Sequence, residues 1–351
     1  MTVADHAADV VVIGAGQAGL SAAYHLRRAG FANDSGFVVL DHGKCAGGAW
    51  QYRWPSLVLG KVHGIHDLPG MAFGMPDVTR PASEVVSEYF ARFERTFDLP
   101  VRRPADVTAV RRAGERLMVE TPAETWEARA VISATGTWDR PFLPYYPGSF
   151  AGRQLHTADY RGAEEFRGRR VVVVGGGASA VQLQMEIAPV AQSVTWVTRR
   201  PPVWRDEPFS ENWGRHAVAK VERRVREGLP PESVVSVTDL AVTAEVRAAR
   251  TAGYLDRQPM FDRLVPEGVV WSDGRFAPAD IILWATGFRA SIDHLAPLHL
   301  RTRGGGIRLD GTRVLAEPRL HLVGYGPSAS TIGANRAGRA AVREIGRLLG
   351  K

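Results

Sequence analysis

Two glycine-rich turns, each directly after a run of apolar residues, constrain this chain more than any other feature. The first, Gly14-Ala-Gly-Gln-Ala-Gly19, follows residues 10–13, and the second, Gly175-Gly-Gly-Ala-Ser-Ala180, follows residues 171–174. A short continuous apolar run indicates a buried strand of a parallel sheet. A glycine turn between such a strand and a helix is typical of a dinucleotide-binding fold, because backbone amides can approach a pyrophosphate there. The sequence therefore predicts two such folds.

The order of the later elements predicts that one of these folds is inserted into the other. Each copy of the pattern runs strand, glycine turn, helix, strand and hairpin, and then ends in Ala-Thr-Gly, at 134–136 and at 285–287. In the first copy, residues 125–128 and 131–134 are predicted as two separate strands. A last strand at 320–323 and a C-terminal helix would return to complete the first fold. We therefore predict the α/β class, with two nested Rossmann-like domains.

The residue that closes the second strand differs between the two copies. Asp41 closes it in the first copy, where a carboxylate would accept hydrogen bonds from the adenosine ribose hydroxyls. Arg199 and Arg200 close it in the second copy. An acid would repel a 2′-phosphate, whereas arginines attract it and can bind it bidentately, so we expect NADPH rather than NADH. The alternative is a pair of solvated surface arginines in a chain whose basic residues are almost all arginine.

Composition excludes several other classes of protein. The 351 residues suit two domains, and the apolar fraction of 45% is ordinary for a globular protein. The single cysteine, Cys45, cannot form an internal disulfide or a Cys-x-x-Cys redox pair. The net charge is +7 without a dense basic block, and no apolar run approaches the roughly 20 residues of a membrane span. We expect a cytoplasmic protein with no nucleic-acid or membrane partner.

A third motif lies between the two folds. It reads Phe150-Ala-Gly152-Arg-Gln-Leu-His156-Thr-Ala-Asp-Tyr160 and matches the pattern F-x-G-x-x-x-H-x-x-x-[FWY]. Together with Gly47-Gly-Ala-Trp50 and Ala285-Thr-Gly-Phe288, it resembles the class B flavoprotein monooxygenases, which include flavin-containing, Baeyer–Villiger and YUCCA enzymes. The length is most similar to that of short bacterial flavin-containing monooxygenases.

The resemblance implies a function for each domain. Residues 1–145 and 286–351 would form a discontinuous FAD-binding domain, interrupted by an NADPH-binding domain of residues 146–285. The inserted domain would carry a helical insertion around residues 204–264. Trp204, Trp213, Met260 and Phe261 of that insertion could line a substrate pocket.

The resemblance also implies a reaction. NADPH would reduce FAD, and O2 would then form a C4a-(hydro)peroxyflavin that passes one oxygen to a small soft nucleophile (sulfur or nitrogen) or a ketone. The partners would be a small-molecule substrate and O2, possibly within a homodimer. Residues 51–66 lack the asparagine of larger relatives, and Gly324-Tyr-Gly-Pro327 lacks an acid for the flavin ribityl chain. An alternative is therefore a reductase or oxidase that passes electrons to ferredoxin or O2 without oxygenating a substrate.

The candidate cofactor-binding residues come from the two glycine turns, the strand ends, the Gly-Gly-Ala-Trp segment and the two Ala-Thr-Gly turns. They are Gly14, Gly16, Gln17, Gly19, Asp41, Gly48, Trp50, Thr135, Gly136, Gly175, Gly177, Ala178, Ser179, Ala180, Arg199, Arg200, Ala285, Thr286 and Gly287. Trp50 and Trp54 would either wall the flavin or pack in the core. No metal site is expected.

Four residues are candidates for roles in the chemistry. Lys61 and His63 follow Trp54, and one of them could hydrogen-bond the peroxide; surface roles are the alternative. His156 belongs to the third motif and is interpreted as positioning NADP⁺ or the linker rather than as a general base. Arg205 follows the aromatic stretch Pro-Pro-Val-Trp and could stabilise a peroxyanion.

Overall fold

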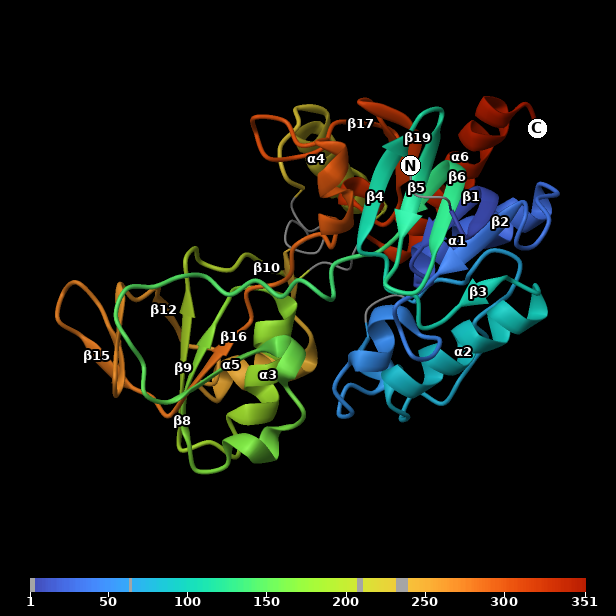
Figure 1. Ribbon diagram of the computed structural model, residues 1–351. Coiled ribbons are helices and arrows are strands. Elements are labelled where there is room, and N and C mark those ends of the chain that lie inside the picture. The colour runs from blue at the N-terminus through green and yellow to red at the C-terminus, as the bar shows by residue number, and fades with distance from the viewer. Residues whose placement is uncertain (1–3, 63–64, 207–210, 232–238) are drawn as a thin grey trace.

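The chain forms two α/β domains joined by two paired polypeptide connections, and the segment that carries α4 (Glu211–Arg226) also passes from the inner domain to the outer one (Figure 1). A computed structural model describes residues 4–62, 65–206, 211–231 and 239–351, with side chains omitted at 211–217. The predicted α/β class is confirmed, and so is the nesting, because the strands of one parallel sheet are inserted in the sequence between strands of the other. Within the described residues, no helix is long and apolar enough to cross a membrane.

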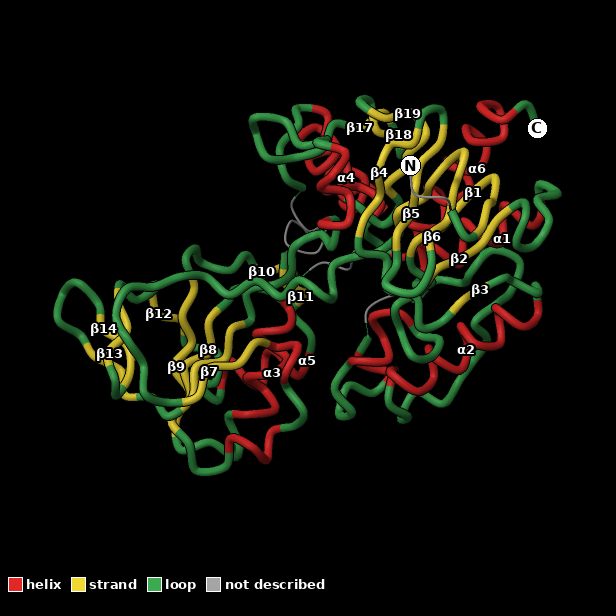
Figure 2. The backbone as a smooth tube through the Cα atoms, in the orientation of Figure 1, coloured by secondary structure: helices red, strands yellow, loops and turns green. Residues whose placement is uncertain are grey.

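The outer domain is built on a nine-stranded sheet. Its strands are β1 (His6–Ile13), β2 (Phe37–Leu40), β3 (Val101–Arg102), β4 (Ala109–Ala113), β5 (Arg116–Glu120), β6 (Thr125–Ser133), β17 (Leu309–Asp310), β18 (Arg313–Val314) and β19 (Glu317–Leu322). Strands β3, β2, β1, β6 and β19 are parallel in that order, and the β4–β5 hairpin and β17–β18 are antiparallel additions. Its helices are α1 (Gln17–Arg28), α2 (Ala82–Thr96) and α6 (Thr331–Leu349), and Figure 2 shows their placement beside the strands.

Strand β6 corrects the prediction of two strands at 125–128 and 131–134. It is one continuous strand, in which the first half alternates between buried and half-exposed residues and the last four residues are all buried. The change of pattern arises because the first half pairs with the hairpin strand β5, whereas the second half lies between β1 and β19. Arg129, at the change, forms an ion pair with Asp9 at 3.1 Å.

The inner domain is built on a five-stranded parallel sheet. Its strands are β7 (Arg153–His156), β8 (Arg170–Val174), β9 (Ser193–Thr198), β12 (Arg257–Pro259) and β16 (Ile281–Trp284), in the order β12-β9-β8-β16-β7. Helices α3 (Ala178–Ile187) and α5 (Ala244–Thr251) pack together on it. A separate antiparallel sheet comprises β13 (Arg263–Val265), β14 (Gly268–Val270) and β15 (Phe276–Pro278).

The predicted helical insertion at 204–264 is only partly helical, and one of its helices, α4, leaves the inner domain. It contains α4 (Glu211–Arg226), α5, and the short strands β10 (Trp204–Arg205) and β11 (Leu240–Ala241), which pair with each other. Helix α4 lies against the outer domain, near β17 (Figure 1). Val225 joins the outer core, and its Cγ2 would lie 2.9 Å from a Cβ at Gly326. The sequence shows the apolar face of this helix but not which domain it covers.

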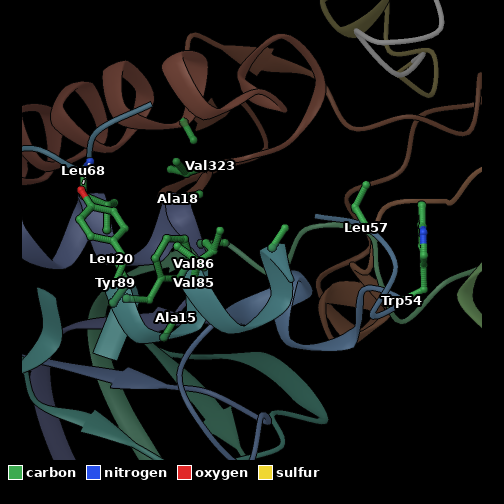
Figure 3. Packing of buried hydrophobic residues seen from close by; sticks show 14 of the residues in the cluster. Ala15, Ala18, Leu20, Trp54, Leu57, Leu68, Val85, Val86, Tyr89 and Val323 are labelled. Atoms are coloured by element: carbon green, nitrogen blue, oxygen red, sulfur yellow. Dashed lines mark hydrogen bonds between the residues drawn. The ribbon is translucent and has the colours of Figure 1, made fainter. Parts of the chain in front are cut away.

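Apolar side chains from α1, α2 and the segment between β2 and α2 form much of the outer core. Figure 3 shows Leu20, Val86 and Tyr89 among them, with Trp54 at one side. The Tyr89 hydroxyl accepts a hydrogen bond from the Leu68 amide at 2.7 Å and donates one to the Met71 carbonyl at 2.6 Å. These bonds hold the segment that follows the Gly-Gly-Ala-Trp motif against α2.

The two connections between the domains run side by side as an antiparallel pair. The Phe142 amide donates to the Gly287 carbonyl at 2.9 Å, the Arg289 amide to the Arg140 carbonyl at 2.8 Å, and the Ser291 amide to the Gly136 carbonyl at 2.9 Å. Each connection begins at an Ala-Thr-Gly turn, so the pairing brings the ends of the two sheets toward one junction.

Candidate functional site

The first glycine turn has no room for a side chain at its first and last glycines, whereas its middle glycine faces open space. A Cβ at Gly14, where φ is +95°, would lie 2.8 Å from the Ala134 carbonyl oxygen, and one at Gly19 would lie 1.8 Å from the Gly14 oxygen. Gly16, between them, faces open space and precedes α1 without a side-chain cap. The amides at the start of α1 are therefore available to an anionic group.

The second glycine turn repeats this arrangement. A Cβ at Gly175 would lie 2.2 Å from the Ala285 oxygen, so the first glycine of each turn packs on the alanine of its Ala-Thr-Gly turn. Gly177 faces open space and precedes α3 without a side-chain cap. In contrast, α5 and α6 begin with side-chain caps from Thr243 and Ser330. Helix α2 also begins without a side-chain cap, at Pro81, so an uncapped start is not unique to the helices that follow glycine turns.

Asp41 is buried and has a partner at each oxygen. Oδ1 accepts a hydrogen bond from the Ala15 amide at 3.1 Å, and Oδ2 accepts one from Arg103 Nε at 2.5 Å. The Arg103 guanidinium also binds both oxygens of Glu94 at 2.7 Å. Sequence reasoning missed Arg103 and Glu94, although Arg103 directly follows β3, the neighbour of β2. The network fixes the carboxylate beside the first glycine turn.

The end of β9 has the opposite charge. Arg199 and Arg200 are exposed, and no ion pair joins either to a carboxylate in the described ranges. The buried Thr198 hydroxyl donates to the Arg200 carbonyl at 2.6 Å. Arg257, on β12, donates to the Thr198 hydroxyl at 2.8 Å and to its carbonyl at 3.0 Å. Arg257, which sequence reasoning also missed, therefore anchors the segment that carries the two arginines.

The threonines of the Ala-Thr-Gly turns tie each turn to the opposite connection. The Thr135 hydroxyl donates to the Ser291 carbonyl at 2.5 Å, and the Thr286 hydroxyl donates to the Phe142 carbonyl. Gly136 and Gly287 have positive φ angles and open space where a Cβ would stand. These predicted cofactor residues therefore shape the junction whether or not they contact a cofactor.

His156 is a buried tie between the third motif and the second Ala-Thr-Gly turn. Its Nε2 donates to the Gly287 carbonyl at 3.0 Å, and its Nδ1 accepts from the Ala158 amide at 3.1 Å. Burial lowers the pKa of His156, which favours the neutral ring that this pair of bonds requires. With both nitrogens engaged by backbone, the geometry supports a positioning role rather than proton transfer.

The comparisons with known proteins agree on the family. The family model described as pyridine nucleotide-disulphide oxidoreductase matches residues 11–254. A flavin-containing monooxygenase from Stenotrophomonas maltophilia is 38% identical, with a TM-score of 0.83 over 98% of this chain and 99% of that chain. The chain belongs to the class B flavoprotein monooxygenases. It is an oxidoreductase, and its cofactors are FAD and NADPH.

More distant matches include both larger enzymes and proteins of similar length. A Baeyer–Villiger monooxygenase from Streptomyces coelicolor is 28% identical over 71% of this chain, and the match spans about half of that protein, 49%. An uncharacterised CzcO-like oxidoreductase from Geobacillus kaustophilus is 24% identical over 84% of this chain and 88% of that protein. A bacillithiol disulfide reductase from Bacillus cereus, 18% identical with a TM-score of 0.72 over 98% of this chain and 100% of that chain, shares the fold.

Several orphaned polar atoms show that the outer domain of the monooxygenase fits a cofactor beside its first turn. A Cβ at Gly48, in the short helix η1 (Gly48–Tyr52), would lie 2.8 Å from Gly16 Cα, so η1 abuts that turn. Buried atoms without a hydrogen-bond partner gather on these segments and on α2: Gln17 Oε1, Trp54 Nε1, Ser87 Oγ and Arg53 Nε. Such atoms are costly unless a ligand or water satisfies them.

The remaining candidates lie at the domain boundary or in the core of the monooxygenase. Lys61 is exposed at the end of the short helix η2 (Leu59–Lys61), and its carbonyl accepts a hydrogen bond from Gln182 of α3 at 3.4 Å. Arg205 lies in β10, with its Nε buried. His63 and the side chain of Trp213 lie outside the described residues. Phe261 is buried in the inner core, where it packs against Tyr146 and Trp284. The prediction that Phe261 lines a substrate pocket is therefore wrong.

Trp54 lies where the two domains of the monooxygenase meet. It is 3% exposed, and its ring meets that of Tyr160 edge to face at 5.9 Å. The Tyr160 hydroxyl donates to Glu186 of α3 at 2.9 Å, and the Ser56 hydroxyl donates to the same oxygen at 2.7 Å. These contacts tie the segment after η1 of the outer domain to α3 of the inner domain. No group of three or more metal-ligating side chains occurs among the described residues.

Proposed function

We propose that the chain is an NADPH-dependent FAD monooxygenase that transfers one oxygen atom of O2 to a small sulfur or nitrogen nucleophile or to a ketone. The overall balance is NADPH, H⁺, O2 and substrate giving NADP⁺, water and oxygenated substrate. The observation that carries the proposal is the junction, where two uncapped glycine-turn helices and two paired Ala-Thr-Gly turns belong to facing dinucleotide folds.

The two folds would bind different cofactors. The amides at Gly16 and the start of α1 would hold the pyrophosphate of FAD, and Asp41 would accept hydrogen bonds from its ribose. The amides at Gly177 and the start of α3 would hold the pyrophosphate of NADPH. The exposed Arg199 and Arg200 would bind the 2′-phosphate.

The protein's own part in the reaction is positioning and exclusion of water. The flavin, when bound, supplies hydride acceptance and activation of O2. His156 would hold the turn at Gly287, against which the nicotinamide half must lie. Trp50 would give the junction an apolar wall, packed from behind by the buried Trp54 and Tyr160, and a dry site protects an oxygenating intermediate from water. Lys61, His63 and Arg205 stay candidates for contacts to the reacting oxygen.

A reductase or oxidase without substrate oxygenation is the second candidate. The described part of the loop after Trp50 has no asparagine, and the turn at Gly324 has no acid. The structure, however, brings Asn335 of α6 to this region. Its amide donates to the Asp67 carbonyl at 2.6 Å, and its Oδ1 accepts from Gln17 at 3.0 Å. Both polar atoms of this side chain thus have partners within the protein, so Asn335 does not decide between the two candidates.

One experiment separates the two candidates. The FAD-loaded protein is reduced anaerobically with NADPH and mixed with O2 in a stopped-flow spectrophotometer, with and without excess NADP⁺. Oxygenation predicts a transient absorbing species, distinct from both reduced and oxidised flavin, that lasts longer with NADP⁺. Direct return to the oxidised spectrum, with one equivalent of peroxide released, would sink the monooxygenase proposal.

Two further expectations, on location and on oligomeric state, stay predictions. Cytoplasmic location and a homodimer are proposed from the sequence alone. Size-exclusion chromatography with light scattering would test the dimer, because a mass near the monomer's 38.3 kDa across the concentration range would contradict it.

A further inference from the structure

One cation at the junction has no anion beside it. Arg53 directly follows η1, and its guanidinium carbon lies 4.8 Å from the centre of the Trp138 ring and 5.7 Å from that of Trp50. Its Nε is buried and has no hydrogen-bond partner. No carboxylate in the described chain forms an ion pair with it, and burial alone lowers the pKa of its guanidinium below the ordinary value.

Arg103, which also lies near the first glycine turn, has carboxylate partners. Arg103 binds the carboxylates of Asp41 and Glu94, so its charge is neutralised twice. A buried charge without a partner destabilises a fold, and proteins retain such groups mainly where function requires them. Arg53 therefore needs an explanation that Arg103 does not.

The aromatic rings around Arg53 come from three segments that meet at the junction. Trp50 belongs to η1, Trp138 follows the first Ala-Thr-Gly turn, and Phe288 follows the second. The Trp138 ring stacks with that of Phe288 at 5.1 Å and with that of Tyr52 at 6.0 Å. Arg53 thus lies where the carboxyl ends of both parallel sheets open, the region where ligands bind in such folds.

The tryptophan rings satisfy only part of what a buried guanidinium requires. An aromatic face attracts the positive charge but supplies no oxygen to accept the N–H donors. A carboxylate or phosphate supplies both charge and acceptors, and its two oxygens can match the guanidinium fork. The unused donors of Arg53 are therefore suited to an oxyanion.

We propose that Arg53 binds an oxyanion at the domain junction, either a carboxylate of the substrate or a phosphate of NADPH. The uncapped starts of α1 and α3 already offer amides for the two pyrophosphates, so Arg53 provides a third, separate anion contact. Naming the sources rests on the proposed function, whereas the oxyanion contact itself does not.

The test uses oxidised, FAD-loaded protein without turnover, so its result is independent of whether the enzyme oxygenates anything. Acetate, inorganic phosphate and NADP⁺ are titrated into wild type, Arg53→Met and Arg53→Lys, and dissociation constants are read from flavin difference spectra and tryptophan fluorescence. Loss of a charged bidentate contact should raise the affected dissociation constant at least about tenfold in Arg53→Met and less in Arg53→Lys. Arg289→Met is the matched control, because Arg289 is exposed and lies 4.0 Å from the Phe142 ring.

Each outcome decides the proposal. A higher dissociation constant for acetate with NADP⁺ unchanged identifies a carboxylate contact, and a higher constant for NADP⁺ identifies a cofactor phosphate. A rise for inorganic phosphate alone also establishes the oxyanion contact. The melting temperature of Arg53→Met should equal or exceed that of wild type, because an unpaired buried charge is removed. If no dissociation constant changes more than twofold, or if wild type binds neither acetate nor phosphate and NADP⁺ binding is unchanged, the proposal is overturned.

Discussion

The two glycine turns share a backbone plan but differ in how closed they are. In both, the first glycine packs on the carbonyl of an alanine across the sheet, at Ala134 and Ala285. The first turn is followed by a buried Asp41 inside a charge network, and the second by two exposed arginines. Burial suits a cofactor that stays bound through turnover, whereas exposure suits one that must leave after each cycle. On the proposed assignment of FAD and NADPH, the two similar motifs would serve a resident and an exchanging ligand.

The largest expected difference between the two turns lies at their last position, which is Gly19 in the first turn and Ala180 in the second. In Gly19→Ala, the new Cβ would lie 1.8 Å from the Gly14 oxygen, a contact that overpacks a closed turn. We expect FAD content to fall at least tenfold and stability to fall by about 3 kcal/mol. Ala180→Gly, at the same place in the second turn, is the matched control and should retain its FAD. Flavin absorbance per protein and thermal melting measure both, and normal FAD content in Gly19→Ala would contradict the packing argument.

The charge at the end of β9 gives the next largest effect. Replacing both Arg199 and Arg200 by alanine should lower kcat/KM for NADPH by roughly 10- to 100-fold, since two charge-assisted hydrogen bonds are lost. The value for NADH should change by less than about threefold, because that cofactor has no 2′-phosphate for the arginines to bind. Steady-state kinetics with both cofactors measure the ratio. An unchanged preference would refute the 2′-phosphate assignment.

Arg257 is expected to affect the second turn indirectly, through its hydrogen bonds to Thr198. Arg257→Met removes two hydrogen bonds that fix the segment before Arg199, so KM for NADPH should rise about fivefold while kcat stays the same. Arg275→Met, an exposed arginine of the same domain bound to Asp273, serves as the control. A fall in kcat with KM unchanged would show that Arg257 does not act on cofactor binding.

A further prediction concerns the acid stability of the outer domain and needs no substitution. Burial lowers the pKa of His294 and of His321 to about 4, from an ordinary value near 6.5. Above pH 6.5 both states of the protein hold these rings neutral, so the free energy of unfolding is unaffected. Between pH 6.5 and 4 the unfolded chain binds protons that the folded chain refuses, so stability falls as pH falls. Urea titrations at pH 7.5 and 5.0 measure this, and equal midpoints would contradict it.

Local patterns predicted much of the fold. Residues 37–40 and 281–284 are strands with the expected bounds, because continuous apolar runs in a parallel sheet have few alternatives. The break predicted inside β6 was wrong, since one strand changes neighbours along its length. The docking of α4 on the outer domain depends on which surface is left uncovered, and no local pattern encodes that.

The site could be predicted only where a residue acts through its position in a motif. The first turn and Asp41 follow adjacent strands of the outer sheet, and the second turn and the arginines after β9 follow adjacent strands of the inner sheet. Arg103, Arg257 and Arg53 each also contact a residue that is far away in the sequence: Asp41, Thr198 and Trp138. In an arginine-rich chain, nothing local separates such residues from solvated ones.

The paired connections also determine how the inner domain can move. A single connection would act as a swivel and allow rotation about its own axis. Two connections side by side, cross-linked by backbone hydrogen bonds between 136–142 and 287–291, would resist torsion more than a single one, and α4 on the outer domain adds a further restraint. The nicotinamide would then approach the flavin along one arc, with the same face presented in every cycle.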